Sequence, residues 1–186
     1  LVKKIGEGVE SLNRMVTNLL NYTRPLQLNL RPVDFLEVVE DCLGFFEIDA
    51  GNRLDNVELC REFPMGTVPC KTDPEQIQQI VLNLLHNAVQ AMPSGGQIRV
   101  GVSEADERAE AGGLSGPCIT LIVVDSGIGM TDEVKEKLFM PFFTTKEDGT
   151  GLGLATARKV IEAHGGEILV DSVPHQGSTF TLFIPK

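Results

Sequence analysis

The sequence predicts an α+β fold, in which a mixed sheet packs on helices as a two-layer α/β sandwich preceded by a coiled-coil-like helix. Two observations lead to this class. Hydrophobic residues make up 42% of the 186 residues, which is enough to build the core of one ordinary domain. Segments with helical and with strand periodicity are mixed, without the regular strand–helix–strand alternation of a parallel α/β sheet.

Residues 1–23 are expected to form the first helix, because apolar side chains recur at alternating steps of three and four. They are Val2, Ile5, Val9, Leu12, Val16 and Leu19. This narrow seam is typical of a coiled coil and needs a partner helix; an ordinary amphipathic helix lying on the following domain is the alternative. Prolines follow Arg24 and Arg31 and mark the exit from the helix. We therefore expect two units, residues 1–31 and 32–186, within a longer protein.

A second helix is expected to begin after Asp34, and residues 56–63 alternate loosely as a strand. Asp73 is expected to cap a long helix that has Pro74 at its first position. The remaining expected elements are strands over 95–102 and 118–125, a short helix near 131–138, a helix over 152–164 ended by two glycines, and strands over 167–172 and 178–184.

Charge and composition limit the partners. The net charge is −10 and no run of Lys or Arg is present, which counts against a nucleic-acid partner. No apolar run approaches the roughly 20 residues of a membrane helix, so we expect no membrane contact by this segment. The four cysteines lack CxxC or zinc-like spacing, which favours free buried thiols and a cytoplasmic location.

The stretch NLLHNAVQAM, residues 83–92, carries the first candidate site. A helix advances about 100° per residue, so Asn83, Asn87 and Gln90 fall on one narrow face, with His86 at its edge. Amide oxygens are neutral hard ligands of the kind that Mg²⁺ accepts beside phosphates and water. Two solvated asparagines are the alternative explanation of this face.

The stretch VVDSGIGM places Asp125 at the end of a buried strand, followed by Gly127 and Gly129. A carboxylate there can accept a hydrogen bond from the exocyclic amine of adenine and would repel the carbonyl of guanine. The glycines allow a close approach of the backbone to a flat ring. A tight turn after a strand is the alternative.

The stretch DGTGLGLATARKV has Gly149, Gly151 and Gly153 directly before a helix, where backbone N–H groups and the helix dipole favour a phosphate. It matches neither the dinucleotide fingerprint nor a Walker A loop. Lys146 could add a positive charge over the phosphates, or could be a solvated surface lysine. The nearby phenylalanines could anchor a lid or a partner, or belong to the core; they are Phe139, Phe142 and Phe143.

Together these motifs resemble the catalytic domain of sensor histidine kinases, within the superfamily of gyrase, Hsp90, histidine kinase and MutL ATP-binding domains. The resemblance covers roughly residues 32–186, is closest in wording to nitrogen-regulation-type kinases, and rests on five stretches in order: NLLHNA, DSGIGM, LFMPFFTTK, GTGLGLA and GSTFTLFIP. It implies a Bergerat-type fold with ATP and Mg²⁺ as cofactors. It implies that Asn87 binds the metal ion and Asp125 reads adenine. The residues it implies in nucleotide binding are Asn87, Asp125, Gly127, Gly129, Lys146, Thr150, Gly151, Leu152, Gly153 and Leu154.

The resemblance also assigns the catalytic positions to Asn83 and Asn87. Hydrolysing branches of the superfamily carry a water-activating glutamate at the position of Asn83, so the site is expected to hold ATP for transfer. Gln90 departs from the pattern, because many relatives have a phosphate-contacting lysine there.

The resemblance implies further partners. No histidine of this chain has the setting of the family's phosphoacceptor, which is therefore expected on an upstream hairpin whose second helix resembles residues 1–23. The resemblance also implies a response regulator receiver domain and a homodimer of the full-length protein. The competing hypotheses are an ATPase of the same fold and a non-catalytic interaction module.

Overall fold

The computed structural model describes residues 26–50, 56–105, 116–146 and 149–186; the helix expected over 1–23 lies outside them. The described elements, in chain order, are β1 (Arg31–Asp34), α2 (Phe35–Ala50), β2 (Val57–Glu62), β3 (Pro69–Thr72), α3 (Pro74–Ala91), β4 (Gly96–Ala105), β5 (Cys118–Asp125), α4 (Asp132–Lys137), α5 (Gly153–Ala163), β6 (Glu167–Val173) and β7 (Gly177–Pro185). Each helix and strand expected from Asp34 onward is present. The strand β4 continues to Ala105, into a stretch that was expected to be loop.

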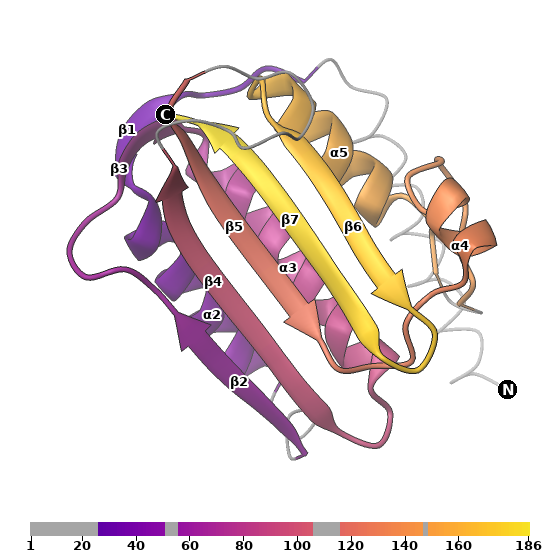
Figure 1. The fold of residues 1–186 in the computed structure, drawn as a ribbon. Helices are drawn as coiled ribbons and strands as arrows, with labels where there is room; N and C mark the ends of the chain where they lie inside the picture. Colours follow the sequence, from indigo (N-terminus) through magenta and orange to yellow (C-terminus); the bar gives the residue numbers. More distant parts are fainter. Residues whose placement is uncertain (1–25, 51–55, 106–115, 147–148) are drawn as a thin grey trace, which may run out of the picture.

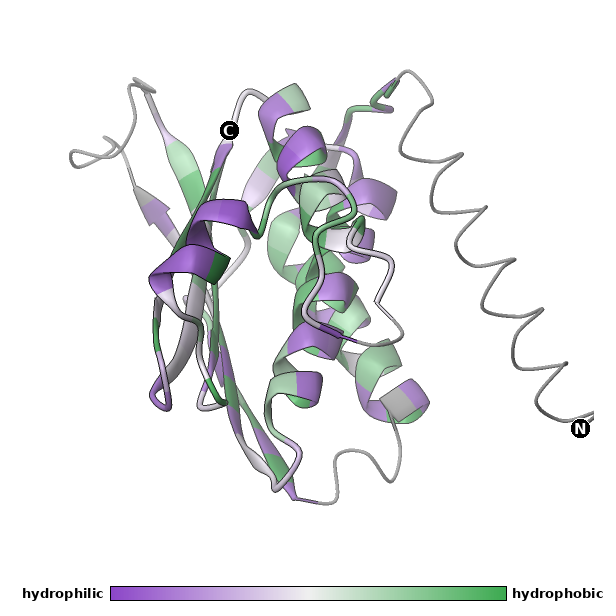
Figure 2. Ribbon diagram, turned by 90° about the vertical axis from the view of Figure 1, so that its right-hand side faces the viewer, coloured by the Kyte–Doolittle hydropathy of each residue, from purple (hydrophilic) through white to green (hydrophobic). Residues whose placement is uncertain are grey.

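The main sheet has five strands in the order β2-β4-β5-β7-β6. The pair β2–β4 is parallel, and the other neighbouring strands are antiparallel. The long helices α2, α3 and α5 lie behind this sheet in Figure 1. Figure 2, which shows the molecule from the side, separates one layer of strands from one layer of helices. The predicted mixed two-layer α+β fold is confirmed.

The core lies between the two layers because each strand turns every second side chain toward the helices. On β5 and β7 the buried apolar residues that follow this alternation are Ile119, Leu121, Val123, Phe180, Leu182 and Ile184. Asp125 follows in the same alternation, so the strand directs its carboxylate toward the helix layer as well. The aromatic rings of Phe35 and Phe46 complete the core from α2, and burying each such side chain contributes about 1.5–3 kcal/mol.

The helix α3 has the predicted cap and the predicted faces. Asp73 at its N-cap accepts a hydrogen bond at Oδ1 from the N–H of Gln76, at 3.1 Å, and Pro74 occupies the first turn. The predicted apolar face is buried; its residues are Val81, Leu84, Leu85, Ala88 and Met92. The opposite side of the helix therefore keeps the amides of Asn83, Asn87 and Gln90 for other contacts.

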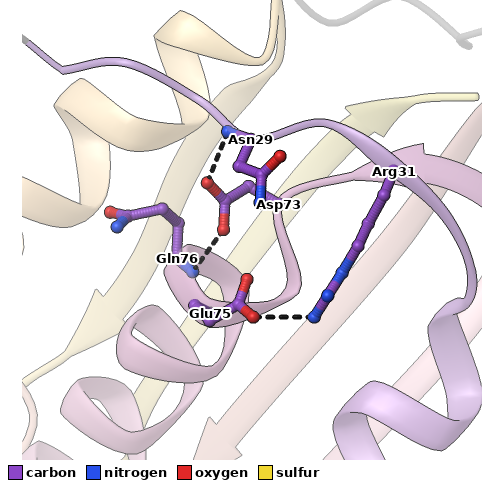
Figure 3. A network of polar contacts seen from close by, with 5 residues as sticks. All are labelled: Asn29, Arg31, Asp73, Glu75 and Gln76. Carbon is purple, nitrogen blue, oxygen red and sulfur yellow. Dashed lines mark hydrogen bonds and ion pairs between the residues drawn. The ribbon is translucent and has the colours of Figure 1, made fainter.

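A second, two-stranded sheet was not predicted. The strands β1 and β3 pair antiparallel, with Arg31 opposite Thr72. The segment before β1, residues 26–30 (the linker), is fastened to the start of α3, as Figure 3 shows. The N–H of Asn29 donates to Asp73 Oδ2 at 2.8 Å, and Arg31 pairs with Glu75 at 2.7 Å. No helix in the described part of the chain is long and apolar enough to cross a membrane.

Candidate functional site

Asp125 is a buried carboxylate at the C-terminal end of β5, with 5% of its surface exposed. Its Oδ1 accepts a hydrogen bond from the N–H of Gly127 at 2.9 Å. Burial raises the pKa of Asp125, and hydrogen bonds from Gly127 and from Ser178, its partner on β7, partly offset this effect. The structure thus holds a carboxylate in a fixed orientation beside the helix layer, where a ligand's N–H group could donate to it.

The turn after Asp125 packs directly on the end of α3. The N–H of Ile128 donates to the carbonyl of Ala91 at 3.0 Å. A Cβ on Gly127 would lie 2.7 Å from the same carbonyl oxygen, so no larger residue fits without a shift. Gly129 has φ of +63°, and a Cβ there would lie 2.0 Å from the carbonyl oxygen of Val173. Both predicted glycines are therefore required by the chain's own packing.

Asn83 connects α3 to the start of α5. Its Oδ1 lies 2.2 Å from the point where a Cβ of Gly153 would stand, so a larger residue at the first position of α5 would displace the Asn83 amide. Its Nδ2 is buried and has no hydrogen-bond partner in the described part of the chain. A buried amide donor without a partner costs free energy, and a ligand acceptor at this point would remove that cost.

The predicted phosphate loop leads into α5. Gly151 has φ of +65°, and its carbonyl accepts from the N–H of Phe142 at 2.9 Å. Leu152 is the N-cap residue of α5 and makes no side-chain hydrogen bond to the helix. The first turn of α5 is therefore without a side-chain cap, which is the arrangement that favours an anion.

The leucines of this loop take part in packing. The side chain of Leu152 is buried and that of Leu154 packs against the core. Contacts from these two residues to a ligand would therefore come from their backbone, whereas Thr150 is half-buried.

Lys146 lies on the polar face of α3. Its ammonium donates to Asn87 Oδ1 at 2.6 Å and to Gln90 Oε1. Burial of the ammonium lowers the pKa of Lys146, although the residue as a whole is exposed. The structure therefore brings together Asn87 and Lys146, two of the predicted site residues, from segments far apart in the sequence.

The histidine of this stretch contacts an aromatic residue of α2. The ring of His86 meets that of Phe46 edge-on, with centroids 5.3 Å apart. This contact joins α3 to α2, and His86 is half-buried.

Phe139 and Phe142 divide between the two expected roles, and Phe143 is half-buried. Phe139 packs against the core, with the guanidinium of Arg158 at 5.5 Å from its ring centroid. Phe142 is 60% exposed and has φ of +67°. The residue available for a contact with another segment is therefore Phe142.

The described residues also limit the kind of metal site. They contain no group of three or more His, Cys, Asp or Glu side chains able to hold a metal ion. An amide site is compatible with the geometry, because Asn87 Oδ1 already binds a cationic group. A separate hollow of about 650 Å³, lined among others by Arg31, Glu37 and Asp41, contains none of the predicted site residues.

Comparison with known proteins places these motifs in a family. The profile of the family described as "Histidine kinase-, DNA gyrase B-, and HSP90-like ATPase" matches residues 72–186. The chain belongs to this family. The matched range contains α3, the turn after Asp125 and the loop before α5, so every predicted site residue lies inside the family domain.

Individual members of the family give the nearer relationship. The chain is 37% identical over 186 residues to sensor histidine kinase ZraS of Escherichia coli (strain K12). This match covers 100% of this chain and 37% of ZraS. The chain therefore spans little more than a third of this relative. It is 31% identical to the solved catalytic domain of histidine kinase ThkA, with a TM-score of 0.69, covering 85% of this chain and 96% of that one.

A second solved structure is that of ThkA in complex with the response regulator protein TrrA. Here the identity is 28% and the TM-score 0.77, and the match covers 100% of this chain and 50% of ThkA. The resemblance to sensor histidine kinases is confirmed, and the described fold is that of their catalytic domain.

Proposed function

We propose that the chain is the ATP-binding catalytic part of a two-component sensor histidine kinase. It would bind ATP with Mg²⁺ and transfer the γ-phosphate to a histidine outside this sequence. The observation that carries the proposal is the arrangement of Asp125 and α3. A buried, oriented carboxylate lies at one end of the site, and a face of neutral amides extends from it toward an uncapped helix start.

The roles follow from the chemistry of each group. Asp125 would accept a hydrogen bond from the amine of adenine, with Gly127 and Gly129 keeping the turn close to α3. The backbone N–H groups at the start of α5, in the loop from Gly149 to Gly153, would bind phosphate oxygens. Asn87 would supply an oxygen to Mg²⁺, which when bound neutralises phosphate charge.

Asn83 is the residue that favours transfer over hydrolysis. An amide cannot take a proton from water, so Asn83 cannot act as a general base. Its buried Nδ2 has no partner in the described part of the chain and would be satisfied by a phosphate oxygen. Catalysis would then consist mainly of positioning and charge neutralisation.

The three histidines of this chain support an acceptor elsewhere. His164 accepts from the N–H of Asp73 and contacts the carbonyl of Val160, so both ring nitrogens are engaged. His175 lies in the turn between β6 and β7, and His86 packs on Phe46. The proposed partners are an upstream phosphoacceptor hairpin, a second copy of the full-length protein, and a response regulator, as found for ThkA with TrrA.

A calorimetric titration with ATP and Mg²⁺ tests the proposal. Saturable binding followed by a flat baseline is expected. Asp125→Asn should weaken binding by about tenfold or more, because a hydrogen bond to a charged group contributes about 1.5–3 kcal/mol. Asp171→Asn, at an exposed position of β6, is the matched control and should bind as the parent does.

Two outcomes would contradict the proposal. Continuing heat after saturation would indicate an ATPase, and the absence of binding would leave a non-catalytic interaction module. Equal affinity of the parent and of Asp125→Asn would remove the base-reading role of the carboxylate.

A further inference from the structure

Two amide oxygens of α3 hold the side chain of Lys146. The ammonium donates to Asn87 Oδ1 and to Gln90 Oε1 at the same time. These acceptors are three residues apart on α3, which places them side by side on one face of the helix. The two amides, Asn87 and Gln90, therefore bind one cation together, and we call this pair the cradle.

The cradle is electrically neutral. No carboxylate pairs with Lys146 among the described residues, whereas Lys135 and Lys186 both have acidic partners. A hydrogen bond between opposite charges gains Coulombic attraction that a bond to a neutral amide lacks. An anionic phosphate would therefore be a better partner for this ammonium than the two amides are.

Helix lengths explain why a loop residue reaches this place. α3 has 18 residues and α5 has 11, and the start of α5 meets Asn83 in the middle of α3. The turns of α3 that carry Asn87 and Gln90 extend past the start of α5. The loop before α5 covers them, and a turn in which the N–H of Lys146 donates to Thr144 Oγ1 at 3.1 Å supports the lysine there.

We propose that Gln90 is a positioning residue for Lys146. With Asn87 it holds the ammonium on α3 while the nucleotide site is empty. When nucleotide binds, the ammonium keeps its contact with Gln90 Oε1, donates to a phosphate oxygen as well, and leaves Asn87 Oδ1 to the divalent cation. This inference rests on the proposed function, since it needs a nucleotide at the site.

Exchanging the two residues tests the role of the cradle. Lys146→Gln removes the ammonium and should weaken binding of ATP with Mg²⁺ about tenfold, the loss expected for one charge-assisted contact. The double variant Gln90→Lys/Lys146→Gln restores one ammonium and one amide to the same pair from opposite sides. It should recover most of the lost affinity. Gln90→Leu keeps the charge but removes the acceptor, and should give a smaller loss than Lys146→Gln.

Binding of adenosine distinguishes the loss of a phosphate contact from general damage to the site. Adenosine carries no phosphate, so its affinity should be the same for the parent and for all three variants. Lys137→Gln, at an exposed position at the end of α4, changes the net charge equally and should leave ATP affinity unchanged.

Each other outcome overturns the inference. Unchanged ATP affinity in Lys146→Gln would make the contact incidental, and equal losses for ATP and adenosine would indicate a damaged pocket. A double variant as weak as Lys146→Gln would exclude the cradle, and Gln90→Leu binding as tightly as the parent would exclude positioning. If the parent itself binds no ATP, the proposed function fails first; if the parent binds and the variants do not differ, the inference alone fails.

Discussion

Replacing Asp73 with alanine tests how much stability depends on the point where the linker, α3 and α5 meet. Asp73 is 4% exposed, and both of its carboxylate oxygens are used. Oδ1 caps α3 through the N–H of Gln76, and Oδ2 accepts from the N–H of Asn29 (Figure 3). Loss of an N-cap costs about 1 kcal/mol. The N–H of Asn29 lies in an exposed residue and can turn to water, so its lost bond should cost about 1 kcal/mol more.

Asp73→Ala should therefore lower the free energy of unfolding by about 2 kcal/mol. Urea titration followed by circular dichroism gives this quantity, provided that the slope against urea is unchanged. Asp73→Asn keeps a capping oxygen and should lose about half as much. Glu75→Gln is the neighbouring control, because its ion pair with Arg31 is more than half exposed and should contribute less than about 1 kcal/mol.

The effect should also depend on pH. Burial by itself raises the pKa of Asp73, but hydrogen bonds from Asn29 and Gln76 outweigh it and the pKa is lowered. A lowered pKa means that the contribution to stability is present above the ordinary aspartate value of about 3.9 and is lost as pH falls through the folded value. The difference between parent and Asp73→Ala should be constant near neutrality and should shrink below about pH 4. A loss under about 0.5 kcal/mol, or equal losses for the alanine and asparagine variants, would refute the reasoning.

Two other predictions use the site and the core. Gly153→Ala would bring a Cβ to within 2.2 Å of Asn83 Oδ1; it should cost about 1–3 kcal/mol of stability and weaken ATP binding, as measured by thermal unfolding and calorimetry. Burial raises the pKa of the Cys42 thiol to about 12. Alkylation of Cys42 by iodoacetamide at pH 8 should therefore be negligible in the folded protein and rapid in urea, and mass spectrometry of the peptide that contains it measures the difference.

Local periodicity was sufficient to predict most of the fold. The faces of α3 follow from the 3.6-residue repeat, and Asp73 follows from cap chemistry at one position. The pairing of β1 with β3 could not be predicted in this way. Each strand has four residues and contains a proline, which argues against a strand, and only the partner strand far along the chain makes these segments extended.

The sequence predicted which residues form the candidate site, but only some of the contacts between them. The sequence indicated that Asp125, Asn87 and Lys146 belong together, but it did not indicate that Lys146 contacts Gln90. That contact spans 56 residues and depends on how a loop returns over a helix. Ser178, which supports the carboxylate of Asp125 from β7, was missed for the same reason, because strand register relates residues that have no local pattern in common.

The helices α3 and α5 are fixed to each other at two points, and this explains why two similar amides can differ in role. At one end the N–H of Asp73 donates to His164 Nε2 at 3.2 Å, directly after α5. At the other, Gly153 lies against Asn83. At about 1.5 Å per residue, the distance from Asp73 to Asn83 along α3 is close to that from His164 back to Gly153 along α5, so the two contacts fit one antiparallel register. Asn83 is consequently enclosed by the start of α5, whereas Asn87, one turn further along α3, lies beyond it and accepts a hydrogen bond from the loop residue Lys146.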